Sequence, residues 1–285
     1  TYPFQRHHYW LSAAERVGDL AGAGLSVVGH PLVAAGVSMA EGGGFVFTGR
    51  ISTRTHPWLA DHMVLDRVLV PGAALLELVL GAGQHMGAER LDELVLHTPL
   101  TLPSDDDTGL DIQVGIDAAD ERGAYAVRLH SRPHRPERDD EAADWVCHAT
   151  GTLTASASAP GDEHADAEPE ADAQWPPTGA EPVDIDAFYE RLADHGYGYG
   201  PVFQGVRAVW RRGEELFAEV RLPESAAGDA DRFGVHPALV DAALQTRLVG
   251  LLEGETERMM PLSFSGARLH ATGATVARVR TAPTG

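Results

Sequence analysis

The chain has 285 residues, 44% of them hydrophobic, which suits a globular protein with one large or two small cores. Its formal net charge of −20 argues against nucleic acid and anionic membranes as partners. With no uninterrupted apolar run of about 18 residues and no charged-then-apolar leader, we expect neither a membrane span nor export, and therefore a cytoplasmic protein.

The first half of the chain alternates predicted strands with one helix. Strands are predicted over residues 43–55 and 91–100, and a helix over about 72–86, where apolar residues are concentrated. Three further strands have enough alternation to form a sheet wrapped on that helix, over residues 110–116, 124–130 and 145–154.

The second half repeats this plan after a segment of different composition. Residues 156–182 are rich in Ala, Asp, Glu and Pro, cannot bury enough apolar surface to order themselves, and are predicted to be a linker. The predicted elements that follow are a short helix over 185–193, strands over 206–212 and 216–222, a long helix after His236, and strands over 266–270 and 275–280. We therefore divide the chain into an N-terminal segment 1–24, a first unit 25–155, the linker 156–182 and a second unit 183–285.

One histidine stands out in residues 56–72, which read HPWLADHMVLDRVLVPG. His62 has apolar neighbours on both sides, a setting that lowers a histidine pKa and favours the neutral base. Such a group suits proton abstraction. The alternative is a buried histidine with only a structural role.

Residues 196–205 read GYGYGPVFQG and alternate glycine with tyrosine. Each glycine raises the entropic cost of ordering the backbone, and each tyrosine brings a hydroxyl that needs a partner, so we predict a rigid loop that projects phenols. A plain surface turn would more often use Asn, Asp and Ser.

Residues 236–252 predict a mostly buried helix with Pro237 in its first turn. Asp241 and Gln245 lie four residues apart and so share one face, where the amide could orient the acid while burial raises its pKa. The alternative is a solvent-facing pair. We expect no metal site, since no HExxH or CxxC occurs and the histidine pairs lack a cysteine or carboxylate at ligand spacing.

These segments together resemble the dehydratase domain of modular type I polyketide synthases. That family carries HxxxGxxxxP, here residues 62–71, GYxYGPxF, here residues 196–203, and HPALxDxxxQ, here residues 236–245. Residues 260–264 are similar to a weaker LPFSW-type element, of which Pro261 and Ser263 are retained. Residues 2–11 resemble the segment that follows the acyltransferase in such synthases.

The resemblance implies an α+β double hotdog, two tandem hotdog folds that each wrap an antiparallel sheet around a long helix. It further implies dehydration of a (3R)-3-hydroxyacyl chain to a 2-enoyl thioester, with no cofactor bound by the domain. The substrate would be carried on the phosphopantetheine arm of an acyl carrier protein.

The resemblance also assigns roles to residues in a water-poor tunnel between the two halves. His62 would take the proton alpha to the thioester carbonyl, and Asp241 would protonate the departing hydroxyl. Backbone N–H groups near Pro71 and Gly72 would polarise the carbonyl. The other supporting residues expected at the site are Tyr199, Tyr197, Gln245, Gly200 and Pro201.

The chain departs from the first motif at one position, where Asp66 replaces glycine. Asp tolerates the left-handed backbone better than most residues do. If Asp66 approached His62 it would raise the histidine pKa, and if it faced solvent it would not.

Two rival functions stay open. The first is that of relatives that shift double bonds or close rings; the shifting relatives tend to lack the motif's proline or acid, yet Pro71 and Asp241 are both present. A catalytically silent docking domain has only Asp66 in its favour.

The expected partners follow from the resemblance. They are the acyl carrier protein, the neighbouring acyltransferase and ketoreductase domains of the same polypeptide, and a second copy of the chain. We expect the two-fold contact near residues 30–49, because edge strands need a covering. Since the carrier is usually acidic, docking would use local arginines such as Arg207, Arg211 or Arg212.

Overall fold

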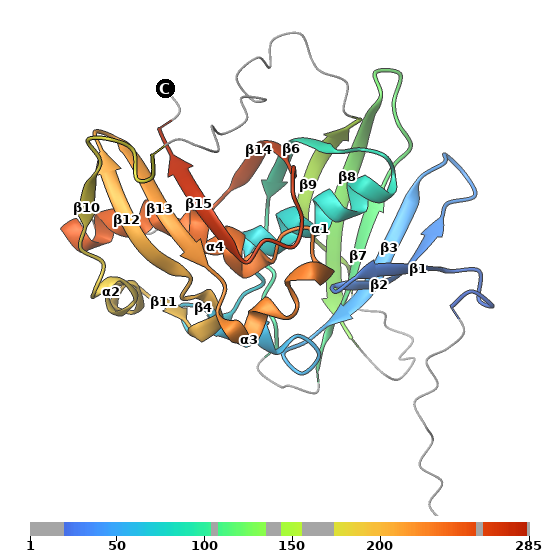
Figure 1. Ribbon diagram of the computed structural model, residues 1–285. Helices are drawn as coiled ribbons and strands as arrows, with labels where there is room; N and C mark the ends of the chain where they lie inside the picture. Colours follow the sequence, from blue (N-terminus) through green and yellow to red (C-terminus); the bar gives the residue numbers. More distant parts are fainter. Residues whose placement is uncertain (1–19, 104–107, 135–143, 156–173, 255–258, 284–285) are drawn as a thin grey trace, which may run out of the picture.

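An antiparallel sheet built mainly from the first half of the chain wraps around helix α1 (Gly72–His85) (Figure 1). The computed structural model describes residues 20–103, 108–134, 144–155, 174–254 and 259–283. The strands of this first sheet, in spatial order, are β1 (Ser26–His30), β2 (Val33–Ser38), β3 (Phe45–Ile51), β7 (Leu110–Ile116), β8 (Ala124–Pro133), β9 (Val146–Thr154), β6 (Arg90–Leu96) and β14 (Ser263–Arg268).

The first core lies between this sheet and α1. Every second residue of β7 is buried, as the pleat of a strand requires when one face covers a core. Helix α1 buries Leu75, Leu78 and Val79 against that face. The predicted helix over residues 72–86 is therefore confirmed, and the predicted strands over 110–116, 124–130 and 145–154 lie next to one another in the sheet.

A buried acid on α1 ties the two halves together. Glu77, 2% exposed, accepts a hydrogen bond from His30 Nε2 at 2.7 Å and another from the backbone N–H of Gly234 at 2.9 Å. Both carboxylate oxygens thus have partners, as a buried acid needs. The contact fixes the chain two residues before His236, at the start of the second long helix.

The second half forms a smaller antiparallel sheet around helix α4 (Pro237–Gln245). Its strands in spatial order are β10 (Glu181–Val183), β12 (Val206–Arg212), β13 (Glu215–Arg221) and β15 (Val276–Thr281). Leu239 and Ala242 of α4 pack with Ala218 and Val220 of β13 in a second core. Helix α2 (Phe188–Asp194) adds Phe188 and Leu192 to this core.

A third, three-stranded sheet joins the halves. It consists of β11 (Tyr197–Tyr199), β4 (His62–Val64) and β5 (Arg67–Val68), in that order. The short remaining elements are helix α3 (Glu224–Ala227) and the 3-10 turns η1 (Pro57–Asp61), η2 (Pro201–Phe203), η3 (Ala230–Arg232) and η4 (Thr246–Glu253). Part of the glycine-rich segment that was predicted to be a loop is therefore a strand.

Strand β14 lies in the first sheet, whereas we predicted it in the second. It pairs antiparallel with β6, with Ser263 opposite Val95 and Phe264 opposite Leu94. Phe264 and Ala267 pack against the first core, and the pairing gives the backbone groups of β6 partners that an edge strand would lack. The final segment of the chain thus crosses from one half to the other.

The predicted helix over residues 236–252 changes character partway. Regular α-helix ends at Gln245, and 3-10 geometry continues as η4. The Thr246 hydroxyl donates to the carbonyl oxygen of Ala243 at 2.7 Å, a bond that competes with the helical backbone pattern. Gly254, with φ 97°, ends the turn in the left-handed region.

The predicted linker is too long at its C-terminal end. Pro182 lies in β10 and pairs with Trp210 of β12, and the Trp175 ring packs edge-on to Phe217 with centroids 5.8 Å apart. These aromatic contacts and ladder bonds hold residues that the composition alone assigned to a solvated tether. Residues 156–173 of the linker and residues 1–19 of the N-terminal segment lie outside the described part of the chain. Among the described helices, none has the length and apolar character needed to cross a bilayer.

Candidate active site

His62 lies at the start of β4 with its ring held in one orientation. Its Nδ1 is 2.9 Å from the carbonyl oxygen of Leu69, and its own carbonyl accepts from the Leu69 N–H at 3.0 Å. Because a carbonyl can only accept, Nδ1 carries the hydrogen and Nε2 of the neutral ring keeps its lone pair. His62 is 5% exposed, and its ring contacts Phe203 and Tyr199. The geometry presents Nε2 as a proton acceptor.

Asp241 projects from α4, which begins with a side-chain cap. Nδ1 of His236 accepts the Ala238 N–H at 3.2 Å, and Pro237 occupies the first turn. Burial lowers the pKa of His236 to about 4, so the ring stays neutral and keeps its acceptor near pH 7. Asp241 is 7% exposed, and burial raises its pKa although His62 and Gln245 both act to lower it.

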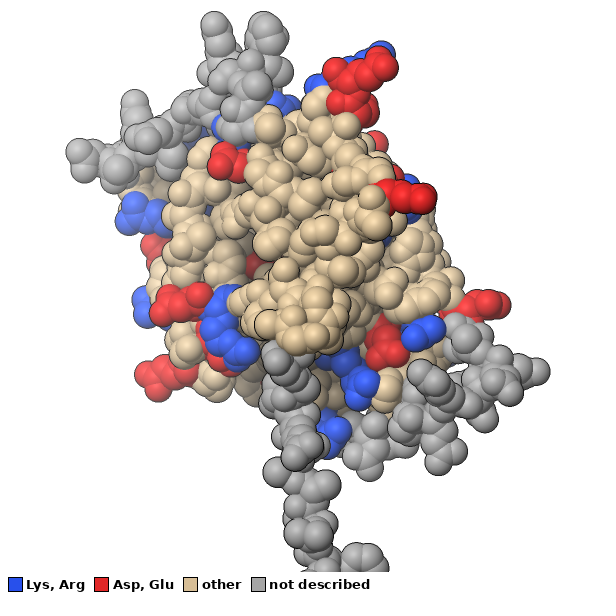
Figure 2. Space-filling view, turned by 90° about the vertical axis from the view of Figure 1, so that its right-hand side faces the viewer, with Lys and Arg blue, Asp and Glu red and all other residues tan. Residues whose placement is uncertain are grey.

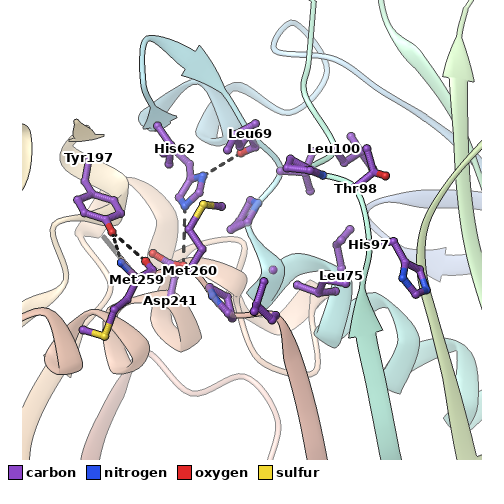
Figure 3. Close-up of a pocket in the computed structure, with 18 of the residues that line it drawn as sticks. His62, Leu69, Leu75, His97, Thr98, Leu100, Tyr197, Asp241, Met259 and Met260 are labelled. Carbon is purple, nitrogen blue, oxygen red and sulfur yellow. Dashed lines mark hydrogen bonds and ion pairs between the residues drawn. The ribbon is translucent and has the colours of Figure 1, made fainter. Parts of the chain in front are cut away.

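The two titratable groups face each other across a short gap. His62 Nε2 is 3.8 Å from Asp241 Oδ1, too long for a hydrogen bond between them and short enough for both to reach one bound molecule (Figure 3). The Gln245 amide nitrogen donates to the other oxygen, Asp241 Oδ2, at 2.8 Å. A base with a free lone pair and a carboxyl whose burial favours the protonated form therefore stand side by side.

A cavity of about 160 Å³ opens at this pair. Its walls are mainly apolar and come from both halves of the chain (Figure 3). From the first half it is lined by Val64, Leu69, Val70, Leu75, Leu96 and Leu100, besides His62. Met259, Met260 and Leu262 line it from the last segment and are 40%, 47% and 75% exposed, so they form an apolar rim toward solvent.

Tyr197 and Tyr199 both line the cavity, but their hydroxyls differ in use. The Tyr197 hydroxyl donates to the carbonyl of Met259 and accepts its N–H, each at 2.8 Å, which anchors the apolar rim. For the Tyr199 hydroxyl no hydrogen bond is found within the described ranges. Burial raises the pKa of Tyr199, so this phenol stays a hydrogen-bond donor. The Tyr197 hydroxyl is thus hydrogen-bonded to Met259, whereas the Tyr199 hydroxyl can donate a hydrogen bond to a bound molecule.

Gly200 and Pro201, which were predicted to be supporting residues, do not line the cavity. The Gly200 N–H donates to the carbonyl of Asp61, and the Asp61 carboxylate accepts the Val202 N–H at 2.9 Å. A Cβ on Gly200 would lie 2.5 Å from the Asp61 carboxylate, so only glycine permits this approach. Asp61, which the sequence did not single out, thereby fixes η2 against the residue preceding His62.

Pro71 and Gly72 lie in the cavity wall at the N-terminus of α1. The first N–H groups of a helix have no partner within it, and the helix dipole places partial positive charge there. A Cβ on Gly72 would lie 3.2 Å from Pro261 and 3.1 Å from Leu96, so glycine also lets the last segment approach. This helix start is suited to a carbonyl oxygen or an anion.

Asp66 faces solvent and lies outside the cavity wall. It is exposed and forms the turn between β4 and β5 with Leu65, at φ 60° and 50° respectively. The motif glycine position is therefore a left-handed backbone position, which Asp occupies at modest cost. The substitution changes the turn and leaves the cavity lining as it is.

Comparisons with known proteins agree with this architecture. Residues 30–132 match the family described as "Polyketide synthase dehydratase domain", and residues 167–283 match "Polyketide synthase dehydratase N-terminal domain". The chain is 46% identical over its whole length to polyketide synthase GfsB of Streptomyces halstedii and to the pikromycin synthase component PikAII of Streptomyces venezuelae. It spans 5% and 7% of the length of these two relatives.

Solved structures show the same fold. The dehydratase domain of the terminal rifamycin module is 44% identical with a TM-score of 0.80, covering 93% of this chain and 90% of that one. The erythromycin dehydratase is 38% identical with a TM-score of 0.79, covering 94% and 91%. The fold and site thus define a double hotdog with a histidine and an acid in one cavity. The chain belongs to the dehydratase domains of modular type I polyketide synthases, as its motifs predicted.

Proposed function

We propose that this domain removes water from a (3R)-3-hydroxyacyl thioester carried by an acyl carrier protein and leaves a 2-enoyl thioester. The observation that carries the proposal is the pairing of His62 Nε2 with Asp241 Oδ1 at 3.8 Å in the wall of an apolar cavity. The family supports the generic dehydration reaction. The configuration and the carrier-bound form are inferred from the resemblance.

The reaction balances on these two groups. Nε2 of His62 takes the proton from the carbon alpha to the carbonyl, and that electron pair forms the double bond. The bond from the beta carbon to the hydroxyl breaks as Asp241 donates its proton, so the leaving group departs as water. Histidine is then protonated and aspartate ionised, and transfer of one proton between them across the short gap restores the starting pair.

Burial of Asp241 and a hydrogen bond to His62 support the roles that this step gives them. The desolvation that raises the pKa of Asp241 keeps a carboxylic acid available as a donor. The Leu69 carbonyl fixes the hydrogen of His62 on Nδ1, so Nε2 is the atom that accepts. Neither group requires a cofactor for its part.

The substrate carbonyl has a natural place at the start of α1. Negative charge develops on the thioester oxygen as the alpha proton leaves, and the first N–H groups of α1, beginning with that of Gly72, can stabilise it there. The apolar wall suits the acyl chain, and the Tyr199 hydroxyl can donate to the substrate or to the leaving oxygen. Gln245 holds Asp241 from behind.

The assay that tests this proposal follows mass and bond position together. The domain is incubated with a 3-hydroxyacyl thioester. Mass spectrometry follows the loss of one water from the substrate, and NMR locates the double bond. Dehydration to the 2-enoyl product is expected. A displaced double bond or a ring would favour the isomerising or cyclising relatives, and no turnover would favour the silent docking domain. Asp66, the one sequence feature in favour of that silent domain, is exposed and lies outside the cavity wall, which supports the dehydration proposal.

A second copy of the chain is the partner we propose for the β1 edge. Strand β1 ends the first sheet and pairs with β2 alone among the described strands. Val27, Val37 and Met39 on β1, β2 and the following turn are 71%, 39% and 46% exposed. Figure 2 shows the side of the molecule toward this edge, with uncharged residues at its centre and charges around the margin. Light scattering at micromolar concentration should give a dimer mass.

The carrier protein and the flanking acyltransferase and ketoreductase domains complete the proposed set of partners. Arg207 on β12 is exposed, whereas Arg212 forms an ion pair with Glu215 at 2.9 Å. Arg207 is therefore the better candidate for contact with an acidic carrier. Charge reversal with Arg207→Glu should slow turnover of carrier-bound substrate, and Arg122→Glu in the turn between β7 and β8 serves as the control.

A further inference from the structure

A buried network of hydrogen bonds links Asp241 to Gln245 and Tyr189, two residues outside the cavity wall. The Gln245 side chain, 2% exposed, uses its nitrogen twice, donating to Asp241 Oδ2 at 2.8 Å and to the carbonyl of Phe203 at 3.0 Å. Its oxygen accepts from the Tyr189 hydroxyl at 3.1 Å. A carbonyl cannot donate, so the group that faces Phe203 must be the amino end of the amide.

The Tyr189 hydroxyl has its own direction fixed. It accepts the N–H of Val206, the first residue of β12, at 2.9 Å. Because the Val206 N–H is a donor and the Gln245 oxygen is an acceptor, the phenolic hydrogen points to Gln245. Burial raises the pKa of Tyr189, so the hydroxyl stays protonated near neutral pH. Tyr189 is thus a constant donor to the amide oxygen.

The orientation of the amide decides where the acidic proton of Asp241 resides. Oδ2 receives an N–H from Gln245 and so acts as an acceptor. The proton of the neutral acid therefore sits on Oδ1, the oxygen 3.8 Å from His62 Nε2. Neither Tyr189 nor Gln245 lines the cavity.

We infer that Tyr189 is a positioning residue for the acid, acting through Gln245 to direct the acidic proton of Asp241 into the cavity. The inference rests on the proposed function, because it assigns a cause to the placement of the proton that the dehydration step uses. Two buried groups, the Gln245 oxygen and the Val206 N–H, lose a partner when the hydroxyl is removed.

The test compares Tyr189→Phe with Tyr125→Phe. Tyr125 packs on the first core, and its hydroxyl has no hydrogen bond within the described residues. For Tyr189→Phe we expect kcat to fall about tenfold with KM unchanged. The alkaline limb of the pH profile of kcat should move to higher pH, because a looser amide no longer lowers the pKa of Asp241. The Tyr125→Phe variant should match the wild type in both respects.

A double-mutant cycle separates positioning from a structural effect. In a Gln245→Ala background, Tyr189→Phe should change kcat less than about twofold, since the amide that connects Tyr189 to Asp241 is already absent. It should still lower the melting temperature there, because the Val206 N–H loses its acceptor in either background. Equal loss of kcat in both backgrounds, or an unmoved pH profile in the single variant, would overturn the inference. A wild type that dehydrates nothing would instead refute the proposed function.

Discussion

Tyr199 lies directly opposite His62 in the antiparallel pair of β11 and β4. Opposed residues of such a pair project from the same face, and the two ring centroids are 5.4 Å apart. One strand belongs to the first half of the chain and the other to the second. His62 and the Tyr199 phenol are therefore brought together by pairing between the halves, and neither half alone contains the site.

Replacing the base tests its role directly. His62→Ala removes the imidazole nitrogen that lies 3.8 Å from Asp241 Oδ1, and general base catalysis contributes about 10²- to 10⁴-fold, so kcat should fall by that order. His97→Ala is the matched control, because His97 lines the same cavity and is bonded to Thr150. It should keep kcat within a few-fold, and an equal loss in both variants would remove the special role of His62.

Asp241→Asn keeps the shape of the acid and cannot donate an acidic proton. The Asn oxygen can still accept from Gln245, so the fold is expected to persist while kcat falls by about 10²-fold or more. Turnover of 3-hydroxyacyl thioester at a near-normal rate would place the acid elsewhere.

The same variant should be more stable than the wild type near pH 7. A carboxyl whose pKa is raised in the folded state binds its proton more tightly there than in the unfolded chain, whose pKa is near 3.8. Its contribution is thus most favourable below that value and is lost as pH rises toward the folded pKa. Melting temperatures should show the Asp241→Asn advantage at neutral pH and its disappearance near pH 3.8, and a constant difference would contradict the shift.

Local patterns predicted much of this architecture. The apolar run of α1, the alternation in β7 and the four-residue spacing of Asp241 and Gln245 each report a local periodicity, and each appears in the structure. Periodicity also predicted strand β14 nearly in place. It could not assign β14 to a sheet, because the choice depends on which edge, that of β6 or of the second sheet, is free in three dimensions.

Contacts between segments far apart in the chain could not be predicted from local patterns. Asp61 accepts the backbone N–H of Val202, and Tyr189 accepts that of Val206. A backbone N–H is present in almost every residue, so the sequence carries no pattern that would predict these bonds. The glycines of residues 196–200 predicted a rigid loop, but its partner segment became visible only when β11 was paired with β4. The motifs predicted His62 and Asp241 as site residues, and the structure shows the hydrogen bonds that orient them.

The contact between Gly200 and Asp61 predicts a sharp cost for a single methyl group. Gly200→Ala would place Cβ 2.5 Å from the Asp61 carboxylate, which must then release the Val202 N–H. We expect a loss of about 1–3 kcal/mol in stability and a lower kcat, because η2 adjoins His62. Gly115→Ala in β7 is the control, since nothing lies within 4 Å of its added Cβ. Urea unfolding of both variants measures the difference.

The turn at Asp66 gives the last prediction. Because Asp66 has φ 60°, Asp66→Gly relieves the strain of a side chain in the left-handed region. The greater entropy of glycine in the unfolded chain offsets this effect, so stability should rise by at most about 1 kcal/mol. Asp66→Val should lower stability, since a branched Cβ fits this region poorly. Because the side chain is exposed and outside the cavity wall, kcat should change less than about twofold in Asp66→Gly. Thermal unfolding with parallel dehydration assays checks both, and a tenfold rise in kcat for Asp66→Gly would show that the acid at the motif position acts on His62 after all.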